Sequence, residues 1–172
     1  MLKKHLDETT RGVFVICATP FTERGDIDFA SADTLVQFYL DARVHGITIL
    51  GMMGEAPKLT FEESTAFTRR VLERVAGLVP VVVGISNPGL AGLAELARVA
   101  LGEGAAAVLV APMAGLRTDD QIFSYYAMVC DALGPDAPVI YQDYPQSTGV
   151  YLSVATYARL VEALRQLVML KA

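Results

Sequence analysis

A chain of 172 residues with 53% hydrophobic residues is long and apolar enough to form one globular domain with a hydrophobic core. Its net charge of −5 and its scattered lysines and arginines argue against nucleic acid and against an anionic membrane surface as partners. Two cysteines and two histidines, far apart in the sequence, argue against a metal site.

The N-terminal region and the apolar segments predict a cytoplasmic location. Residues 1–11 are charged and lack the apolar core and small-residue cleavage site of a secretory signal. The longest uncharged run, Val75 to Ala94, is interrupted by prolines and glycines, so we expect no membrane span. Cys17 and Cys130 are expected to be reduced, buried thiols in that compartment.

The first half of the chain contains two units of strand followed by helix. Residues 13–18 form an apolar run that predicts a strand, and apolar residues at helical spacing predict a helix through 32–39. Gly46 stands where a helix C-terminus favours glycine, and residues 47–50 predict the second strand. A glycine-bracketed turn, Gly51 to Glu55, follows directly. Thr60 and Glu63 then have the spacing of a capping box, which predicts the start of a helix through 67–75.

The same unit repeats through the second half. Strands are predicted at 80–85, 106–111, 139–142 and from 167 onward, and helices through 90–101, 122–133 and 154–164. Thr118 and Gln121 form a second capping box, and the segment from Tyr144 to Gly149 predicts a turn after the fifth strand.

Six strands alternating with five helices predict an α/β fold with a parallel sheet, because parallel neighbours need a helical crossover. Near-continuous apolar strands fit a sheet covered on both faces or a closed barrel. A complete eight-stranded barrel needs about 250 residues. Two architectures fit this pattern. One is a TIM-barrel type array with six of eight strands over residues 12–172, after an arm at 1–11. The other is an open doubly wound sheet with another strand order.

In both architectures the functional groups lie at the C-terminal ends of the strands. Lys171 stands at the end of the apolar strand that begins at Leu167. Apolar surroundings disfavour an ammonium ion and make the neutral, nucleophilic amine more accessible. By position alone, Lys171 also fits a solvated chain end without a role.

Several motifs in series resemble the dihydrodipicolinate synthase and N-acetylneuraminate lyase family. They are the Ala-Thr-Pro-Phe that ends at Phe21, Gly25-Asp26-Ile27-Asp28, the Gly-x-x-Gly-Glu turn at 51–55, Gly104-Ala105-Ala106-Ala107, the Tyr-x-x-x-Pro-x-x-Thr-Gly segment at 141–149 and Lys171. The resemblance runs from Gly12 onward. The chain stops one residue after the lysine, roughly where the sixth of the family's eight strands would end.

The resemblance implies a class I aldolase mechanism on a (β/α)₈ barrel. Lys171 would form a Schiff base with pyruvate or a related 2-oxo acid, with no metal or other cofactor. The turn that carries Met52 and Met53 would hold the substrate carboxylate through backbone N–H groups. A tyrosine of strand five would transfer protons.

The chain departs from the family pattern at several of these positions. Met52 and Met53 replace two hydroxyl residues, and a tyrosine expected after strand four is absent at Met113 and Ala114. Ser147 replaces a basic residue that, in the synthases, holds the carboxylate of a second substrate. These changes argue against lysine-biosynthetic synthase activity.

The strand-five tyrosine has two candidates. Alignment on Pro145 places Gln142 at the family's tyrosine position, between Tyr141 and Tyr144. Gln142 and Tyr144 share one face of a strand, while Tyr141 faces the other way. A bulge or the turn could bring either tyrosine to the site, and packing beneath a helix is an equally good explanation for Tyr141.

The sequence thus predicts carbon–carbon bond chemistry on pyruvate or a related 2-oxo acid through Lys171, with Tyr141 or Tyr144. The alternatives are a non-catalytic relative that binds 2-oxo acids and an inactive, truncated scaffold. Unpaired edges on the first and sixth strands predict a homo-oligomer.

Overall fold

The computed structural model describes residues 6–171. Strands and helices alternate through this part of the chain, and a 3₁₀ helix at Ala56–Lys58 follows the second strand. The strands are β1 (Phe14–Ile16), β2 (Gly46–Ile49), β3 (Val81–Gly84), β4 (Ala107–Val110), β5 (Val139–Gln142) and β6 (Leu167–Lys171). The α-helices are α1 (Phe29–Asp41), α2 (Phe61–Val75), α3 (Leu90–Glu103), α4 (Asp119–Leu133), α5 (Pro145–Thr148) and α6 (Val154–Ala163).

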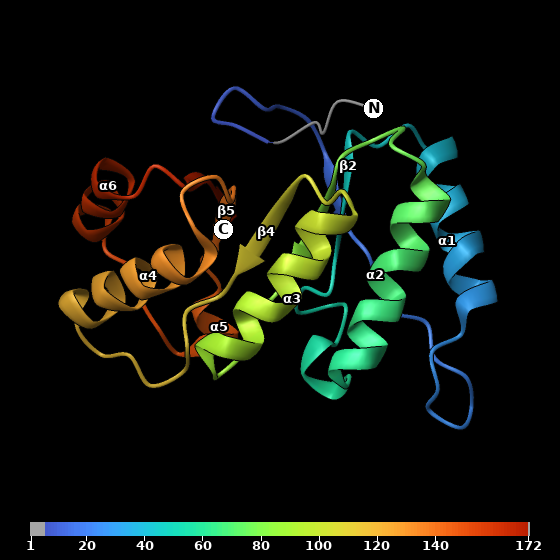
Figure 1. Ribbon diagram of the computed structural model, residues 1–172, viewed down its shortest axis with the longest axis horizontal. Helices are drawn as coiled ribbons and strands as arrows, with labels where there is room; N and C mark the ends of the chain where they lie inside the picture. The colour runs from blue at the N-terminus through green and yellow to red at the C-terminus, as the bar shows by residue number, and fades with distance from the viewer. Residues whose placement is uncertain (1–5, 172) are drawn as a thin grey trace.

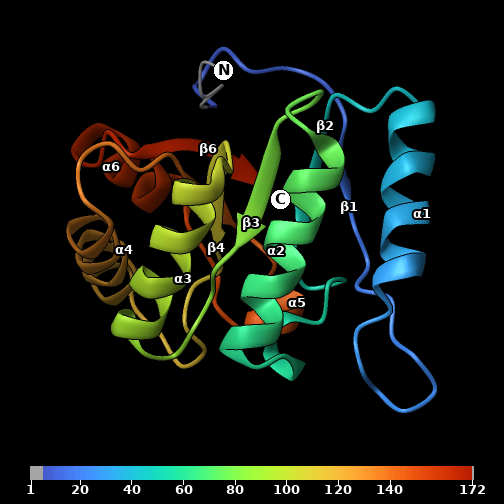
Figure 2. The same ribbon diagram turned by 45° about the vertical axis from the view of Figure 1, so that its right-hand side comes forward.

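All neighbouring strands are parallel and follow one another in sequence order, from β1 to β6. Figures 1 and 2 show α1, α2, α3 and α4 side by side along one face of the curved sheet, with α6 beyond α4. A doubly wound sheet would reverse its strand order and carry helices on both faces. The structure therefore confirms the TIM-barrel type array of six strands and removes the doubly wound alternative.

The local signals in the sequence account for most element boundaries. Both predicted capping boxes are present, with Thr60 opposite Glu63 and Thr118 opposite Gln121. Gly46 does not end a helix, because α1 stops at Asp41 and Gly46 begins β2. The predicted turn after β5 contains the short helix α5, which begins at a proline, a residue suited to the first helical position.

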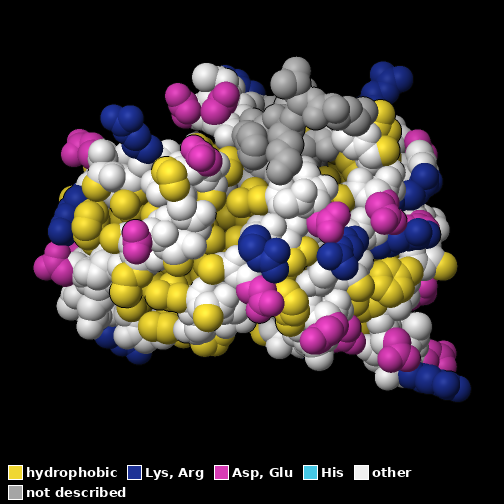
Figure 3. Space-filling view, in the orientation of Figure 1, with side chains coloured by type: hydrophobic (Ala, Val, Ile, Leu, Met, Phe, Trp, Pro, Cys, Tyr) yellow, Lys and Arg dark blue, Asp and Glu magenta, His cyan; other side chains and the backbone are white. Residues whose placement is uncertain are grey.

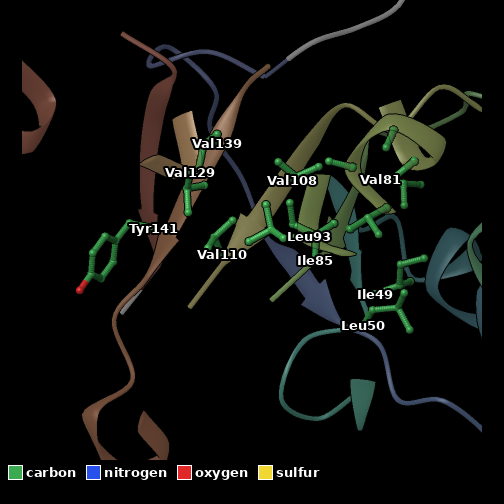
Figure 4. Close-up of a cluster of buried hydrophobic side chains, with 14 of the residues drawn as sticks. Ile49, Leu50, Val81, Ile85, Leu93, Val108, Val110, Val129, Val139 and Tyr141 are labelled. Atoms are coloured by element: carbon green, nitrogen blue, oxygen red, sulfur yellow. The ribbon is translucent and has the colours of Figure 1, made fainter. Parts of the chain in front are cut away.

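The main core lies between the sheet and the helices. Phe67 of α2, Leu93 of α3 and Tyr126 of α4 are fully buried there against outward-facing strand residues. Figure 4 shows part of this cluster, with Val108, Val110 and Val139 projecting from neighbouring strands. The helices cover this outer face, and the other face of the curved six-stranded sheet forms the interior of a partial barrel.

A second, smaller core fills that interior, and the N-terminal segment takes part in it. Val82, Leu109 and Ile140 are buried there together with Leu6, which is 5% exposed. The backbone N–H of Leu6 also donates to the carbonyl of Ala106 at 3.1 Å. Leu6 falls within the arm predicted at 1–11, and residues 1–5 of that arm lie outside the described residues.

Replacing Leu6 with alanine should lower the free energy of unfolding by about 2 kcal/mol, because it leaves a cavity in the interior core. Urea denaturation followed by circular dichroism measures the change. Leu78→Ala is the control, since Leu78 is 73% exposed and should have almost no effect. Equal, negligible effects of both substitutions would show that the Leu6 contact does not contribute to stability.

The outer surface is polar over α1 and α2. Figure 3 shows basic and acidic side chains intermingled at the right of the molecule, and more continuous apolar surface toward the left. Ion pairs join neighbouring helices through Arg70 with Asp33 and Arg69 with Glu103, the latter at 2.9 Å. No helix within residues 6–171 combines the length and the apolar character that crossing a membrane requires.

Candidate active site

A cavity of about 300 Å³ opens at the C-terminal ends of the strands, where the sequence placed the functional groups. Its lining comes from four strands and from the loops that follow β2 and β5. The lining residues are Ile16, Gly51, Met52, Met53, Leu109, Gln142, Tyr144 and Lys171. Figures 1 and 2 show α5 and the loop after β2 together at this end of the molecule. The fold thus brings Lys171, Tyr144 and both methionines of the predicted site to one cavity.

Lys171 enters the cavity as the last residue of β6. It pairs in register with Gln142 of β5, and its carbonyl accepts a 2.7 Å hydrogen bond from the N–H of Asp143. The pairing of β6 with β5 shifts by one residue opposite Val139 and Ile140. As a result, the side chain of Lys171 lies on the same face of the sheet as that of Gln142. The side chain is half-buried, and within the described residues its ammonium group has no ion pair. Lys171 is also the only charged residue among those that line the cavity.

The turn after β2 presents free backbone donors. Its own hydrogen bonds use the N–H groups of Gly54 and Glu55, and within residues 6–171 those of Met52 and Met53 have no protein acceptor. Thr19, which is buried, anchors the turn by donating its hydroxyl to the Gly54 carbonyl at 2.7 Å. Such free donors suit a carboxylate.

Left-handed backbone marks both ends of this turn. Leu50 and Glu55 each have a φ of 54°, a conformation that costs non-glycine residues free energy. The Glu55 carboxylate pairs with the ammonium of Lys58 and does not line the cavity. A costly conformation held by surrounding contacts is typical of a functional turn.

Two polar side chains from the β5 region complete the lining. Gln142 is 3% exposed and has no side-chain hydrogen bond within the described residues. Tyr144 comes from the loop, at the start of α5, and is 42% exposed. Ser147 of α5 donates its hydroxyl to the sulfur of Met52 at 3.5 Å, which links the two loops at the cavity mouth. The tyrosine that lines the cavity is therefore Tyr144, which belongs to the turn after β5.

Tyr141 lies on the opposite face of β5. Its ring stacks on Tyr126 at a centroid distance of 4.5 Å and meets Tyr157 edge-on, in the main core. Figure 4 shows the Tyr141 ring projecting from β5, the strand that also carries Val139, within the same buried cluster as Val110 of β4. Burial, and secondarily the charge of Asp143, raises the pKa of Tyr141, and within residues 6–171 its hydroxyl has no hydrogen-bond partner. Tyr141 does not line the cavity.

Ile16 and Leu109 are the lining residues that the sequence did not single out. Both lie behind the turn, because a Cβ placed on Gly51 would be 3.7 Å from Ile16 and 3.9 Å from Leu109. Side chains alternate between the two faces of a strand, so the sequence assigns Ile16 and Leu109 each to one face of its strand. It does not show which face is turned toward the interior of the sheet, because that depends on how the strands pair.

The thiols and acidic groups give no second reactive centre in the described residues. Cys17 and Cys130 are free and buried, and burial raises the pKa of each thiol to about 11. Within residues 6–171 no group of three or more histidine, cysteine, aspartate or glutamate residues is placed to hold a metal ion.

Comparisons with known proteins identify the family of the chain. The model of the dihydrodipicolinate synthetase family matches residues 9–172. The chain belongs to the dihydrodipicolinate synthetase family. Within the family, it is 36% identical over 165 residues to L-2-keto-3-deoxyarabonate dehydratase of Azospirillum brasilense, covering 94% of this chain and 52% of that protein. It is 34% identical over 162 residues to 4-hydroxy-tetrahydrodipicolinate synthase of Sorangium cellulosum, covering 93% and 53%.

A solved structure of a dihydrodipicolinate synthase is also similar to this chain. The crystal structure of dihydrodipicolinate synthase from Rhodopseudomonas palustris superposes with a TM-score of 0.94 at 40% identity. The match covers 98% of this chain and 56% of that one. The chain therefore spans about half the length of the family members that it matches.

Proposed function

We propose that this chain performs carbon–carbon bond chemistry of the lyase or aldolase type on pyruvate or a related 2-oxo acid, through a Schiff base on Lys171. The observation that carries the proposal is the cavity itself. It combines one amine, Lys171, with a hydroxyl, Tyr144, and with the turn residues Met52 and Met53, whose N–H groups have no acceptor among the described residues. An amine, a proton-transfer group and a carboxylate holder are the three components that this chemistry needs.

The proposed steps use groups of this chain. The neutral Nζ of Lys171 attacks the ketone carbon C2 to give a carbinolamine. The Tyr144 hydroxyl donates its proton to the carbinolamine oxygen, which leaves as water, so that an iminium ion and the Tyr144 phenolate are formed. The N–H groups of Met52 and Met53 hold the substrate carboxylate. Removal of a proton from C3 by the Tyr144 oxygen, acting as a general base, converts the iminium to an enamine, whose C3 is the carbon that forms or breaks the bond.

Borohydride trapping tests the Schiff base. The folded chain is mixed with pyruvate and reduced with borohydride, which converts the iminium to a stable secondary amine. Mass spectrometry of the intact protein and of its peptides is expected to find one reduced pyruvyl group, on Lys171. A folded protein that gains no adduct would overturn the proposal.

The two tyrosines provide a matched test of proton transfer. Tyr144→Phe is expected to slow the exchange of pyruvate C3 protons with deuterium about 100-fold, because general base catalysis is lost. Tyr141→Phe should leave exchange unchanged and raise the free energy of unfolding by about 1 kcal/mol, because it removes a buried hydroxyl that has no partner among the described residues. Nuclear magnetic resonance follows the exchange and urea denaturation the stability. The opposite ranking of the two variants would assign proton transfer to Tyr141.

A second candidate function is binding of a 2-oxo acid without turnover. Two features of the lining favour it, because neither provides an acid or a base. Gln142 carries a carboxamide, which does not act as a proton donor and acceptor in catalysis as a carboxyl or phenol does. Positions 52 and 53 carry the thioethers of methionine. A non-catalytic binder would show a thermal shift with pyruvate but neither an adduct nor C3 exchange. An inactive scaffold would show no thermal shift.

We also expect a homo-oligomer in the cytoplasm. Within residues 6–171, β1 and β6 each pair with a single strand and so carry an unpaired edge, and Leu170 of β6 is 37% exposed. Light scattering after size-exclusion chromatography measures the oligomeric state, and a monomer at micromolar concentration would contradict this expectation.

A further inference from the structure

The Thr19 hydroxyl lies outside the cavity but is bonded to the turn that lines it. Thr19 is 4% exposed and does not belong to the lining. It follows β1, and the pairing of β1 with β2 continues one residue beyond the strand, because the N–H of Cys17 donates to the Thr48 carbonyl at 2.8 Å. This pairing brings Thr19 to the turn that follows β2. There the Thr19 hydroxyl donates to the carbonyl of Gly54 at 2.7 Å.

A chain of hydrogen bonds leads from this hydroxyl to a free donor of the turn. The carbonyl of one residue and the N–H of the next belong to one planar unit, and in a trans peptide they point in opposite directions. The unit between Gly54 and Glu55 accepts from Thr19 at its carbonyl. Its N–H donates to the Met52 carbonyl at 3.2 Å, which belongs to the same unit as the Met53 N–H. The chain of bonds therefore ends at the Met53 N–H, which has no acceptor among the described residues.

The backbone of this turn is strained and closely packed. Leu50 and Glu55 are left-handed, and a Cβ placed on Gly54 would lie 2.8 Å from the backbone nitrogen of Leu50. Such a conformation persists only where surrounding contacts hold it. The bond from the Gly54 N–H to the Gly51 carbonyl lies within the turn, whereas the Thr19 hydroxyl ties the turn to the segment after β1. Loss of that hydroxyl would free the carbonyl of Gly54, and with it the orientation of its peptide unit.

We propose that Thr19 is a positioning residue for the substrate carboxylate, because its hydroxyl, acting through two peptide units, orients the Met53 N–H and makes it a stronger donor. Hydrogen bonds in series polarise one another, so each bond adds to the partial positive charge at the free end. The inference rests on the proposed function, in which the N–H groups of Met52 and Met53 hold the carboxylate. It deepens that function by assigning a role to a residue outside the cavity lining.

Substitution of Thr19 separates carboxylate binding from the chemistry of the amine. Thr19→Val keeps the shape of the side chain and removes the hydroxyl. Lys171 is labelled under borohydride with pyruvate and, separately, with acetone, a ketone without a carboxylate, and the ketone concentration that gives a half-maximal labelling rate is measured. We expect Thr19→Val to need about 10-fold more pyruvate, because a hydrogen bond to a charged group contributes about that factor, but an unchanged concentration of acetone. Thr19→Ser keeps a hydroxyl and should retain most of the affinity for pyruvate.

Thr68→Val is the matched control. Thr68 of α2 is fully buried, and its hydroxyl has no hydrogen-bond partner among the described residues. Its loss should leave labelling by both ketones unchanged. A Thr19→Val variant that labels with pyruvate as the unmodified chain does, or that loses pyruvate and acetone labelling equally, would overturn the inference and leave the Schiff base on Lys171 standing. An unmodified chain without a pyruvate adduct would overturn the proposed function and this inference with it.

Nuclear magnetic resonance tests the same donor in the unmodified chain, whose fold no substitution disturbs. Methionine is labelled with ¹⁵N, and the Met53 amide is assigned by its loss in Met53→Leu. Pyruvate should move the Met53 amide proton downfield, because the carboxylate accepts from it, and the movement should be smaller in Thr19→Val. A Met53 amide that does not respond while pyruvate labels Lys171 would overturn the inference but not the Schiff base.

Discussion

Replacing Lys171 with methionine should abolish borohydride trapping of pyruvate, with labelling at least about 100-fold below that of the unmodified chain. Methionine keeps the length and the apolar stem of lysine but has no amine, and amine addition to the ketone has no substitute among the neutral lining residues. Mass spectrometry of the intact protein quantifies the labelling, and circular dichroism verifies the fold.

Lys58→Met is the matched control for this result. Lys58 is close in sequence to the turn at the cavity, but its ammonium is exposed and paired with Glu55. Loss of that surface pair should change stability by less than about 1 kcal/mol and leave labelling intact. Labelling that persists in Lys171→Met and maps to another lysine would refute the assignment of the nucleophile.

Replacing Gly84 with alanine should lower the free energy of unfolding by about 3 kcal/mol and disturb the turn that carries Met52 and Met53. An alanine Cβ at position 84 would lie 2.0 Å from the carbonyl oxygen of Leu50 and 3.1 Å from the backbone nitrogen of Gly51. Both are backbone atoms, so relief requires the chain after β2 to move. Pyruvate labelling should therefore weaken even at temperatures where the variant is folded.

Gly102→Ala provides the contrasting substitution. Gly102 lies within α3, and apart from its chain neighbours and the backbone of the helix itself, no atom of the described residues lies within 4 Å of a Cβ placed there. Alanine has the higher helix propensity, so this variant should gain about 0.5 kcal/mol and label normally. Urea denaturation compares the two variants. A mild effect of Gly84→Ala, similar in size to that of Gly102→Ala, would show that the turn moves easily and does not fix the site.

Much of the fold could be predicted because its signals are local. Short apolar runs in the sequence predict β3 and β4, and in the structure all four residues of each strand are buried. The capping boxes at Thr60 and Thr118 predict the starts of α2 and α4. The small helix α5 was missed because four residues do not establish a helical period. Leu6 was placed in an arm because its partners, such as Val82 and Ile140, are distant in sequence.

The sequence by itself determined the order of strands and helices, the parallel sheet and the position of Lys171 at a strand end, since each follows from the spacing of neighbouring residues. Only the tertiary structure decided that Tyr144 lines the cavity while Tyr141 packs against Tyr126, and that Ile16 and Leu109 form its back wall. These choices depend on which strand face is turned inward and on the backbone path after β5. Contacts between segments far apart in the chain fix both, and no local pattern encodes them.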